Sequence, residues 1–598
     1  MVKRTLVNLF LVLVMLLTLG VSVVGSAPPA QEEMTYTVKL GDNLWTLAEK
    51  YLGSGPAYWA IVGATNAKHE EDPSFASIEN PSLIHPGWKL IIPSAEEAET
   101  YIALAKPRRG GTLVVGMAAT GIVTLDPAAY SDRPTETVIR NMFDGLVTRT
   151  TKNEVVPELA ESYKWIDNKT IEFKLKEGVT FHNGEPLTAD DVVFTFERIM
   201  TQDIGAKRRG FVKEVESVEK VDDYTVRFNL KSPWPVFLQM LVHNQIVPKD
   251  YLTKVGDEEF AKAPVGCGPF KFVEGKLDEQ IVLERFEEYY GGADDLPPVG
   301  PPFLDRVIFR MIPETSTRVA ALLAGEVDII QSVPAYMVPQ LTGDPNVVVK
   351  TCAGTRPKFM DLNVTRPPFD DVRVRQALNY AVDAETILAK VAGGYGMILP
   401  GPLSPANLYA DPDLEPYGYD PEKAKELLAE AGHKPEEISL VIDAYGPYVE
   451  IAEAVAGQLR ALGMDVSVRT WEYKVVKPLL LACERQAFLR DWGDSAFDPV
   501  GYIEAKWQTR EEGTPKGRGN FACYSNPRVD ELIEAGASEP DPAKRRQIYA
   551  EMQRLIYEDA PAVFLYVPQE IEASSARVRN WAPSPDSRIN LHDVWLAE

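Results

Sequence analysis

The sequence predicts a mixed α/β protein made of a small N-terminal module followed by a much larger one. Two observations predict this class. From residue 111 onward, strand-like and helix-like segments alternate, and residues 34–93 have the pattern strand, helix, helix, strand. The 598 residues are enough for three or more structural units, and the hydrophobic content of 45% supplies a large core.

The first 26 residues have the layout of a secretory signal peptide. Lys3 and Arg4 precede an uncharged apolar run over residues 5–24, and small residues follow at positions 25–27. Cleavage after Ser26 would remove this segment, and the alternative is a retained signal anchor, since the run approaches spanning length. Because no cysteine lies nearby, we expect no lipoprotein anchor. The protein is therefore predicted to be exported, either periplasmic or associated with the cell wall outside the cell.

The charge and the cysteine content argue against a nucleic-acid-binding protein and against a structural zinc site. The net charge of −25 argues against a nucleic-acid partner, because phosphate binding needs clustered Lys and Arg. The four cysteines allow three disulfide pairings, among which the sequence does not choose; they are Cys267, Cys352, Cys483 and Cys523. No C-x-x-C spacing occurs, so we expect no structural zinc. We expect no metal and no cofactor.

The small module shows its elements in order. Residues 36–38 alternate as a short strand, and Gly41 with Asp42 forms a turn in which Asp42 is predicted to be a helix N-cap. Apolar residues then recur at helical spacing over residues 44–51, and a second helix is expected near residues 58–67. Residues 89–92 predict the second strand.

Two segments of this module resemble a lysin-motif (LysM) domain. They are YTVKLGDNLWTLA at residues 36–48 and NPSLIHPGWKLIIP at residues 80–93. LysM domains bind N-acetylglucosamine polymers, notably peptidoglycan, in a shallow groove between two loops. The resemblance places the groove at Gly41, Asp42, Asn43, Leu44, Leu83, Ile84 and His85. Trp45 is interpreted as a core residue. Residues 94–109 are interpreted as a partly helical linker.

The large module, residues 110–598, carries an ordered set of motifs. They are VPELAESY at 156–163, FKLKEGVTFHNGEPLTADDV at 173–192, GCGPF at 266–270, AGEVD at 324–328, PPFDDVRVRQALNYA at 367–381 and YDPEKA at 419–424. In this order they resemble family 5 extracellular solute-binding proteins. That family serves ABC importers for oligopeptides, dipeptides, nickel chelates and, in some branches, oligosaccharides.

The resemblance implies a bilobal periplasmic-binding-protein-like fold of the class II, cluster C type. Lobe I would comprise residues 110–150, 241–352 and 566–598; the extra lobe, 151–240; and lobe III, 353–565. The lobes would close over the ligand about a hinge. The implied partners are the permease subunits of an ABC transporter and a captured solute, and we expect a monomer.

In peptide-binding members, a Trp-x-x-Asp segment before an acid-Pro pair lies in the cleft, and its Asp clamps the peptide ammonium. Residues 491–499 read DWGDSAFDP, which places Ser495 at the clamp and Asp494 one residue earlier, on the opposite face of an extended segment. We expect Arg490, Trp492, Asp494 and Ser495 to line the cleft. The ligand is predicted to be a peptide or a peptide-like solute. The alternative is an oligosaccharide, because sugar hydroxyls suit Ser495 and an aromatic platform, whereas a buried ammonium needs a paired charge.

A wall-degrading hydrolase and a wall-bound sensor or scaffold are two further classes of protein that a LysM domain allows. LysM domains often tether wall-degrading hydrolases, but the sequence has no H-E-x-x-H pair and no G-x-S-x-G elbow. Paired acids such as Asp190-Asp191 fall at predicted helix starts, where capping explains them. We therefore expect no enzyme and no catalytic residue. A wall-bound sensor or scaffold that serves no importer stays open.

Overall fold

The structure is a computed structural model that describes residues 33–39, 41–78, 81, 84–150, 154–201, 207–293, 300–493, 497–585 and 588–597. The predicted signal segment at residues 1–26 lies outside the described residues. The chain divides into two compact units, Met1–Lys106 and Pro107–Glu598. In the described part of the chain, no helix combines the length and the apolar character that a membrane span requires.

The first unit confirms the order strand, helix, helix, strand. Strands β1 (Met34–Thr37) and β2 (Lys89–Ile92) pair antiparallel. Between them come α2 (Leu44–Leu52), the short η2 (Gly55–Ala57) and α3 (Tyr58–Glu71). The apolar faces of both helices and of β2 form one core, which includes Leu47, Ile61 and Leu90.

Two local predictions for this unit were wrong. The N-cap of α2 is Asn43, whose side chain accepts a hydrogen bond from the Thr46 amide at 2.9 Å. Asp42 instead accepts hydrogen bonds from the Lys39 amide at 2.8 Å and from the Tyr36 hydroxyl at 2.7 Å. The hydrogen bond to Asp42 raises the pKa of Tyr36 to about 12. Trp45 is not a core residue, because it is 51% exposed and its ring lies against Gly55.

The segment expected to be a linker forms a helix of the first unit. Helix α4 (Ala95–Ala105) begins with a capping box, in which the Ser94 hydroxyl and the Glu97 carboxylate each accept from the other's amide. It packs on α3. A Cβ at Gly63 would lie 2.6 Å from the Tyr101 carbonyl oxygen, so the two helices approach closely where α3 lacks a side chain.

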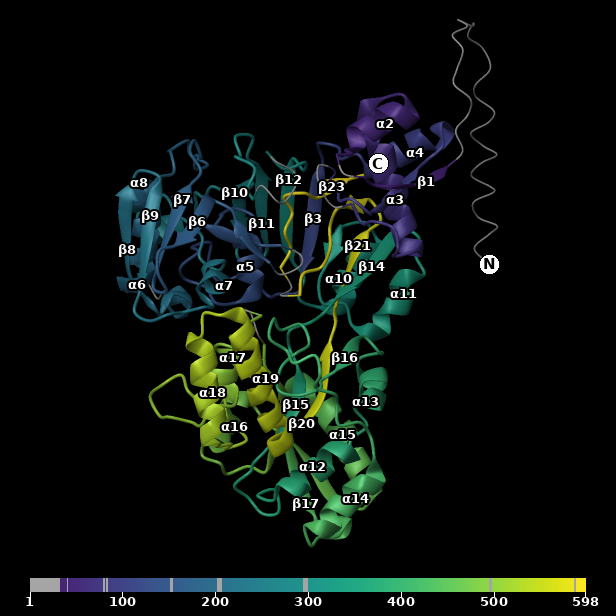
Figure 1. The fold of residues 1–598 in the computed structure, drawn as a ribbon, viewed down its shortest axis with the longest axis vertical. Coiled ribbons are helices and arrows are strands. Elements are labelled where there is room, and N and C mark those ends of the chain that lie inside the picture. Colours follow the sequence, from purple (N-terminus) through teal and green to yellow (C-terminus); the bar gives the residue numbers. More distant parts are fainter. Residues whose placement is uncertain are drawn as a thin grey trace, which may run out of the picture. The chain divides into compact units, whose positions relative to one another are not determined.

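Three sheets organise the second unit, and the first is a seven-stranded sheet drawn from lobe I (Figure 1). Its strands, in spatial order, are β10 (Phe270–Lys276), β11 (Gln280–Arg285), β12 (Arg306–Met311), β3 (Thr112–Met117), β13 (Ile329–Ile330), β21 (Glu570–Ser575) and β14 (Val347–Cys352). Its helices and short elements are α5 (Arg133–Ile139), α8 (Lys249–Val255), α9 (Asp257–Phe260), α10 (Thr315–Leu323), η4 (Ala335–Met337), α11 (Val338–Thr342), β22 (Val578–Arg579) and β23 (Trp595–Leu596).

The extra lobe contains an antiparallel four-stranded sheet. Its order is β6 (Ala160–Trp165), β7 (Thr170–Leu175), β9 (Thr225–Leu230) and β8 (Val215–Asp222). It is accompanied by β5 (Val155–Pro157), α6 (Ala189–Thr201), η3 (Lys207–Val212) and α7 (Phe237–Leu241), and β5 pairs with β4 (Val147–Arg149), which precedes the predicted start of the extra lobe at residue 151. Alternate residues of β7 and β9 are buried, among them Phe173 and Phe228, whose rings meet edge to face.

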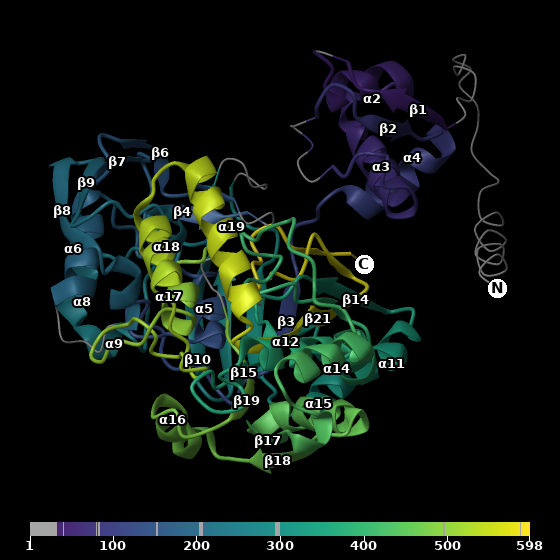
Figure 2. The ribbon, with the colours of Figure 1, turned by 60° about the horizontal axis from the view of Figure 1, so that its bottom comes forward.

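Lobe III is built on a six-stranded mixed sheet. Its order is β16 (Gly396–Ile398), β20 (Ala562–Pro568), β15 (Lys358–Leu362), β19 (Ala487–Asp491), β17 (Ser439–Ala444) and β18 (Asp465–Thr470). Its helices are α12 (Val372–Ala381), α13 (Ala384–Val391), α14 (Pro421–Glu430), η5 (Pro435–Glu437), η6 (Gly446–Tyr448), α15 (Val449–Leu462), α16 (Tyr473–Leu481), α17 (Tyr502–Lys506), α18 (Pro527–Ser538) and α19 (Pro542–Asp559). Helices α18 and α19 lie side by side (Figure 2).

Two chain segments connect the seven-stranded and six-stranded sheets. Strand β14 leads through residues 353–357 into β15, and β20 leads through Gln569 into β21. The two crossings run antiparallel to each other, since β14 pairs with β21 and β15 pairs with β20. A Cβ at Gly354 would lie only 2.1 Å from the Pro568 carbonyl oxygen, so the crossings touch backbone to backbone.

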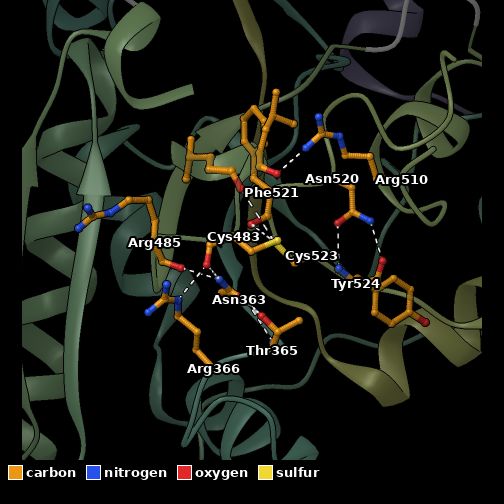
Figure 3. Close-up of a disulfide and its surroundings, with 12 residues drawn as sticks. Asn363, Thr365, Arg366, Cys483, Arg485, Arg510, Asn520, Phe521, Cys523 and Tyr524 are labelled. Carbon is orange, nitrogen blue, oxygen red and sulfur yellow. Dashed lines mark hydrogen bonds between the residues drawn. A yellow bond between two sulfur atoms is a disulfide. The ribbon is translucent and has the colours of Figure 1, made fainter. Parts of the chain in front are cut away.

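The structure selects one disulfide among the pairings that the sequence left open. Cys483 is bonded to Cys523, and the other two cysteines are free thiols, Cys267 buried and Cys352 partly exposed. The disulfide joins the segment that enters β19 to the loop that precedes α18 (Figure 3). Both segments belong to the side of lobe III that carries Trp492.

Candidate ligand-binding site

Strand β19 ends at the predicted cleft segment and gives Arg490 and Asp491 opposite surroundings. Successive side chains of a strand point to opposite faces, so the two side chains have different partners although both are buried. Arg490 is 2% exposed and donates to Asp361 Oδ2 at 2.7 Å and to the Gly519 carbonyl. Lys506 pairs with the same Asp361. The structure thus places Arg490 beneath the predicted site, within a paired and buried network.

Trp492 lies on top of this network. Its ring packs against Gly519, where a Cβ would come within 2.4 Å of the indole. The guanidinium groups of Arg490 and Arg518 lie 5.1 and 5.4 Å from the ring centre, which is the range of cation–π attraction. Trp492 remains partly exposed. The arrangement therefore fixes an aromatic surface of defined orientation immediately after β19.

Asp491, directly before Trp492, forms ion pairs with two cationic side chains. Its carboxylate accepts from Arg356 Nη2 at 2.8 Å and from Arg356 Nε at 3.1 Å, and it pairs with Lys358. Burial would raise the pKa of Asp491, but the charges of Lys358 and Arg356 outweigh it and hold the pKa below its ordinary value. The Lys358 ammonium also lies 5.0 Å from the ring centre of Tyr448.

The predicted clamp positions Asp494 and Ser495 lie outside the described residues, but both flanks of this segment are placed. On one side, a Cβ at Gly493 would lie 2.9 Å from Arg356 Nη1. On the other, Asp498 is buried and forms two hydrogen bonds with the Arg545 guanidinium, at 2.5 and 2.7 Å. The acid of the acid-Pro pair is thus a structural anchor for the segment.

Lobe III meets lobe I and the extra lobe around this segment. The Arg149 guanidinium lies 4.9 Å from the ring centre of Phe497, and Lys213 Nζ lies 3.5 Å from Glu504 Oε2. Near the crossings, Arg133 Nη2 donates to Thr355 Oγ1 at 3.0 Å. The described flanks of the segment, residues 491–493 and 497–498, therefore lie beside parts of the chain that only tertiary folding brings together.

Sequence reasoning missed several charged residues of this region. Arg356, Lys358 and Asp491 form the ion-pair group beside Trp492, and Arg149 contacts the ring of Phe497. The two cations that flank Pro357, directly before β15, could have been noticed as a basic cluster. Arg149 carried no local signal, because its partner lies more than 300 residues away in the sequence.

The two predicted LysM loops come together in the first unit. The Val38 amide donates to the Trp88 carbonyl and the Gly87 amide donates to the Val38 carbonyl, each at 2.8 Å. These bonds bring the end of β1, which leads to Gly41, beside the start of β2. Of the seven predicted residues, Leu44 is buried, Gly41, Asn43 and His85 are exposed, Asp42 and Ile84 are intermediate, and Leu83 lies outside the described residues.

The rest of the described chain was compared with this region for metal-binding groups and hollows. No group of His, Cys, Asp and Glu there has the arrangement of a metal site. A hollow of about 560 Å³ is lined by residues of β12 and α10 and by their neighbours, from Arg310 to Glu326. It lies within lobe I and shares no residue with the segment around Trp492.

The fold and the segment around Trp492 define a binding receptor with two large lobes joined by two crossings. A family model described as "Bacterial extracellular solute-binding proteins, family 5 Middle" matches residues 154–514, and the LysM domain model matches residues 36–60. The chain belongs to the family 5 bacterial extracellular solute-binding proteins and carries a LysM domain. It is the solute-binding component of an ABC importer.

Individual relatives agree with this assignment. The oligopeptide-binding protein AppA of Bacillus subtilis is 32% identical over 521 residues, covering 82% of this chain and 93% of its own. Its structure with a nonapeptide has a TM-score of 0.64 at 29% identity, covering 82% and 100%. The periplasmic binding protein DppA from Helicobacter pylori, in complex with the peptide STSA, has a TM-score of 0.66 at 28% identity, covering 82% and 99%.

Proposed function

We propose that this protein captures peptides between lobe III and lobe I and delivers them to the permease subunits of its importer. The observation that carries the proposal is the segment around Trp492, where an oriented aromatic surface adjoins buried charges of both signs. Peptides offer matching chemistry, namely apolar side chains, backbone amides and charged termini. The peptide complexes of AppA and DppA support the same ligand class, and neither relative favours an oligosaccharide.

The three sheets support a division into lobe I, the extra lobe and lobe III, with the two crossings as the hinge. Their short connecting segments allow the lobes to rotate about residues 353–357 and Gln569. Binding of a solute between the lobes would then stabilise the state in which they touch. In this role the protein is a receptor and performs no chemistry on its cargo.

Native mass spectrometry of the purified full chain tests the ligand class. We expect adducts whose masses form a peptide series and which disappear after mild denaturation. Adducts whose masses differ by one hexose would instead identify the ligand as an oligosaccharide. The absence of any adduct, together with no binding from a peptide library, would contradict solute capture of either kind.

We further propose that the LysM domain holds the exported receptor in the cell wall by binding peptidoglycan. The support is the meeting of its two loops near Gly41 and His85, which leaves both residues exposed. Sedimentation with insoluble peptidoglycan tests this. Because His85 is exposed, His85→Ala should weaken co-sedimentation without changing thermal unfolding, whereas Glu49→Ala on the exposed side of α2 should not. Equal sedimentation of both variants and of a chain lacking residues 34–93 would refute the tether.

A further inference from the structure

Four strands of the six-stranded sheet end at the edge from which the chain crosses to lobe I. Strand β17 pairs parallel with both β18 and β19, so these three strands end at the same edge. Because β19 and β20 are both antiparallel to β15, β20 ends there as well and continues through Gln569 into β21 (Figure 1). In sheets of this kind, ligands bind outside the carboxyl ends of the strands.

Three tyrosines meet at this edge, and we call Tyr445, Tyr448 and Tyr473 the tyrosine platform. Tyr445 directly follows β17, Tyr448 ends η6, and Tyr473 begins α16. The ring centre of Tyr445 lies 4.9 Å from that of Tyr448 and 4.9 Å from that of Tyr473. On its other side, the Tyr445 ring stacks on Phe488 of β19, with ring centres 5.8 Å apart and an angle of 8° between the planes. These contacts fix the orientation of the rings.

The tyrosine platform has a rigid base and an accessible surface. Its base is a buried cluster formed by Phe488 and Phe521 with Val476 and Leu480 of α16. Tyr445 and Tyr473 are nevertheless partly exposed, and Tyr448 is 8% exposed. Aromatic ring surface is thus held in place at the edge of the sheet and remains available for contact with a ligand.

The hydroxyl groups of Tyr445 and Tyr448 are engaged within the protein. Burial, the charge of Asp491 and a hydrogen bond to Asp491 raise the pKa of Tyr448. A further hydrogen bond links the side chains of Tyr445 and Tyr448. What these two residues offer to a ligand is therefore ring surface. An aromatic side chain suits such a surface, because it gains both from burial and from contact between rings.

Asp491 connects the tyrosine platform to the predicted cleft segment. It interacts with Tyr448 and directly precedes Trp492 in the chain. Lys358, which pairs with Asp491, has its ammonium 5.0 Å from the ring centre of Tyr448. The platform therefore continues the aromatic surface that Trp492 begins.

We propose that the tyrosine platform binds an aromatic side chain of the captured peptide, so that the preferred cargo is a peptide that carries such a residue. The inference rests on the proposed peptide-binding function and names the class of peptide. A peptide bound beside Trp492 would place one of its side chains against Tyr445 and Tyr473. Removal of that side chain from water, together with the ring contacts, favours aromatic over small residues.

The test uses the purified full chain and a defined peptide library. The library holds the alanine pentapeptide and its variants with a single Phe or a single Leu at each position. Bound peptides are identified by native mass spectrometry under competition. We expect the best Phe member to be enriched about 10- to 100-fold over the alanine pentapeptide, the range for burial of one large apolar side chain. The corresponding Leu member should be enriched less, because it lacks the ring contacts.

Variants of Tyr473 link the preference to the platform. Tyr473→Ala should lower the Phe enrichment by about 10-fold while the alanine pentapeptide still binds, and Tyr473→Phe, which keeps the ring, should retain it. Tyr473→Leu keeps apolar volume without a ring, so it should lose the preference for Phe over Leu. The matched control is Tyr419→Ala, at a tyrosine of lobe III that is 55% exposed, and it should behave like the wild type.

The outcomes separate this inference from the proposed function. Peptide binding without enrichment of Phe members, equal enrichment of Leu and Phe members, or an enrichment that survives unchanged in Tyr473→Ala overturns the inference alone. Binding of no peptide overturns the proposed function and the inference together.

Discussion

At the scale of single residues, the site is held by buried ion pairs whose partners are far apart in sequence. Asp361 binds Arg490 and Lys506 beneath Trp492, and Asp498 binds Arg545 below the far end of the cleft segment. A buried pair adds little net stability, because desolvation offsets its attraction, but losing one partner strands the other charge. These pairs therefore fix the position of the segment and make it sensitive to substitution.

Asp498→Asn tests this positioning. The variant leaves the buried Arg545 without its carboxylate, so we expect a loss of about 3–5 kcal/mol in the stability of lobe III. The matched control, Glu172→Gln, removes the partner of Arg227 in a more exposed pair and should cost about 0–1 kcal/mol. Chemical denaturation followed by tryptophan fluorescence measures both. Equal transition midpoints for the two variants would show that the Asp498–Arg545 pair is not a structural anchor.

At the scale of elements, a helix cap fixes the start of α10, and the disulfide ties together two segments of lobe III. Glu314 caps α10 by accepting hydrogen bonds from the Ser316 and Thr317 amides, at 3.1 and 2.6 Å. The Cys483–Cys523 disulfide closes a segment that contains β19, Trp492 and α17. The Glu314 cap and the disulfide can each be tested by substitution.

The cap of α10 predicts a pH dependence. The hydrogen bonds from the Thr317 and Ser316 backbone and hydroxyl groups lower the pKa of Glu314 from 4.5 to about 2. Since the folded-state pKa is depressed, the stabilisation is fully present above the unfolded value and is lost as the pH falls through about 2. Glu314→Gln should therefore lower the unfolding temperature at neutral pH. The difference from the wild type should shrink as the pH approaches 2, and a constant difference across this range would refute the cap.

Removal of the disulfide should loosen the same side of lobe III. In the chain-entropy account, closing a loop of this size stabilises the fold by about 2–4 kcal/mol. The double variant Cys483→Ser/Cys523→Ser should lose that amount in a denaturation experiment and bind peptides more weakly, whereas Cys352→Ser should do neither. If the double variant matched Cys352→Ser in both measurements, the disulfide would have no role in shaping the site.

At the scale of the whole molecule, the proposed capture of a solute depends on motion about the two crossings between the large sheets. The contact between Gly354 and the Pro568 carbonyl leaves no room for a side chain. Gly354→Ala should therefore push the crossings apart and disfavour the state in which the lobes touch. Small-angle X-ray scattering with added peptide should then show less compaction than for the wild type. Gly457→Ala, whose Cβ would meet no other atom, is the control; if both variants compact like the wild type, the crossings are not the hinge.

Much of this architecture could be predicted from local patterns, and the failures have physical causes. The helix that the apolar spacing predicts over residues 44–51 is confirmed as α2 (Leu44–Leu52), because helical spacing is a local property of the sequence. Trp45 follows the helical spacing of the core but lies beside Gly55, and hydrophobic spacing does not reveal which flank of a helix stays exposed. The pairing of Cys483 with Cys523 and the burial of Arg490 depend on contacts between residues far apart in the sequence, which the local pattern does not encode.

The central claim is that peptides bind between the lobes beside Trp492. It is tested most directly by photo-crosslinking the full chain to a pentapeptide that carries p-benzoylphenylalanine, followed by peptide mapping. We expect crosslinks near residues 491–498 and on lobe I near residues 130–149, and we expect both to be lost when an unlabelled peptide competes. Competable labels confined to the hollow along α10, or to the LysM domain, would contradict it.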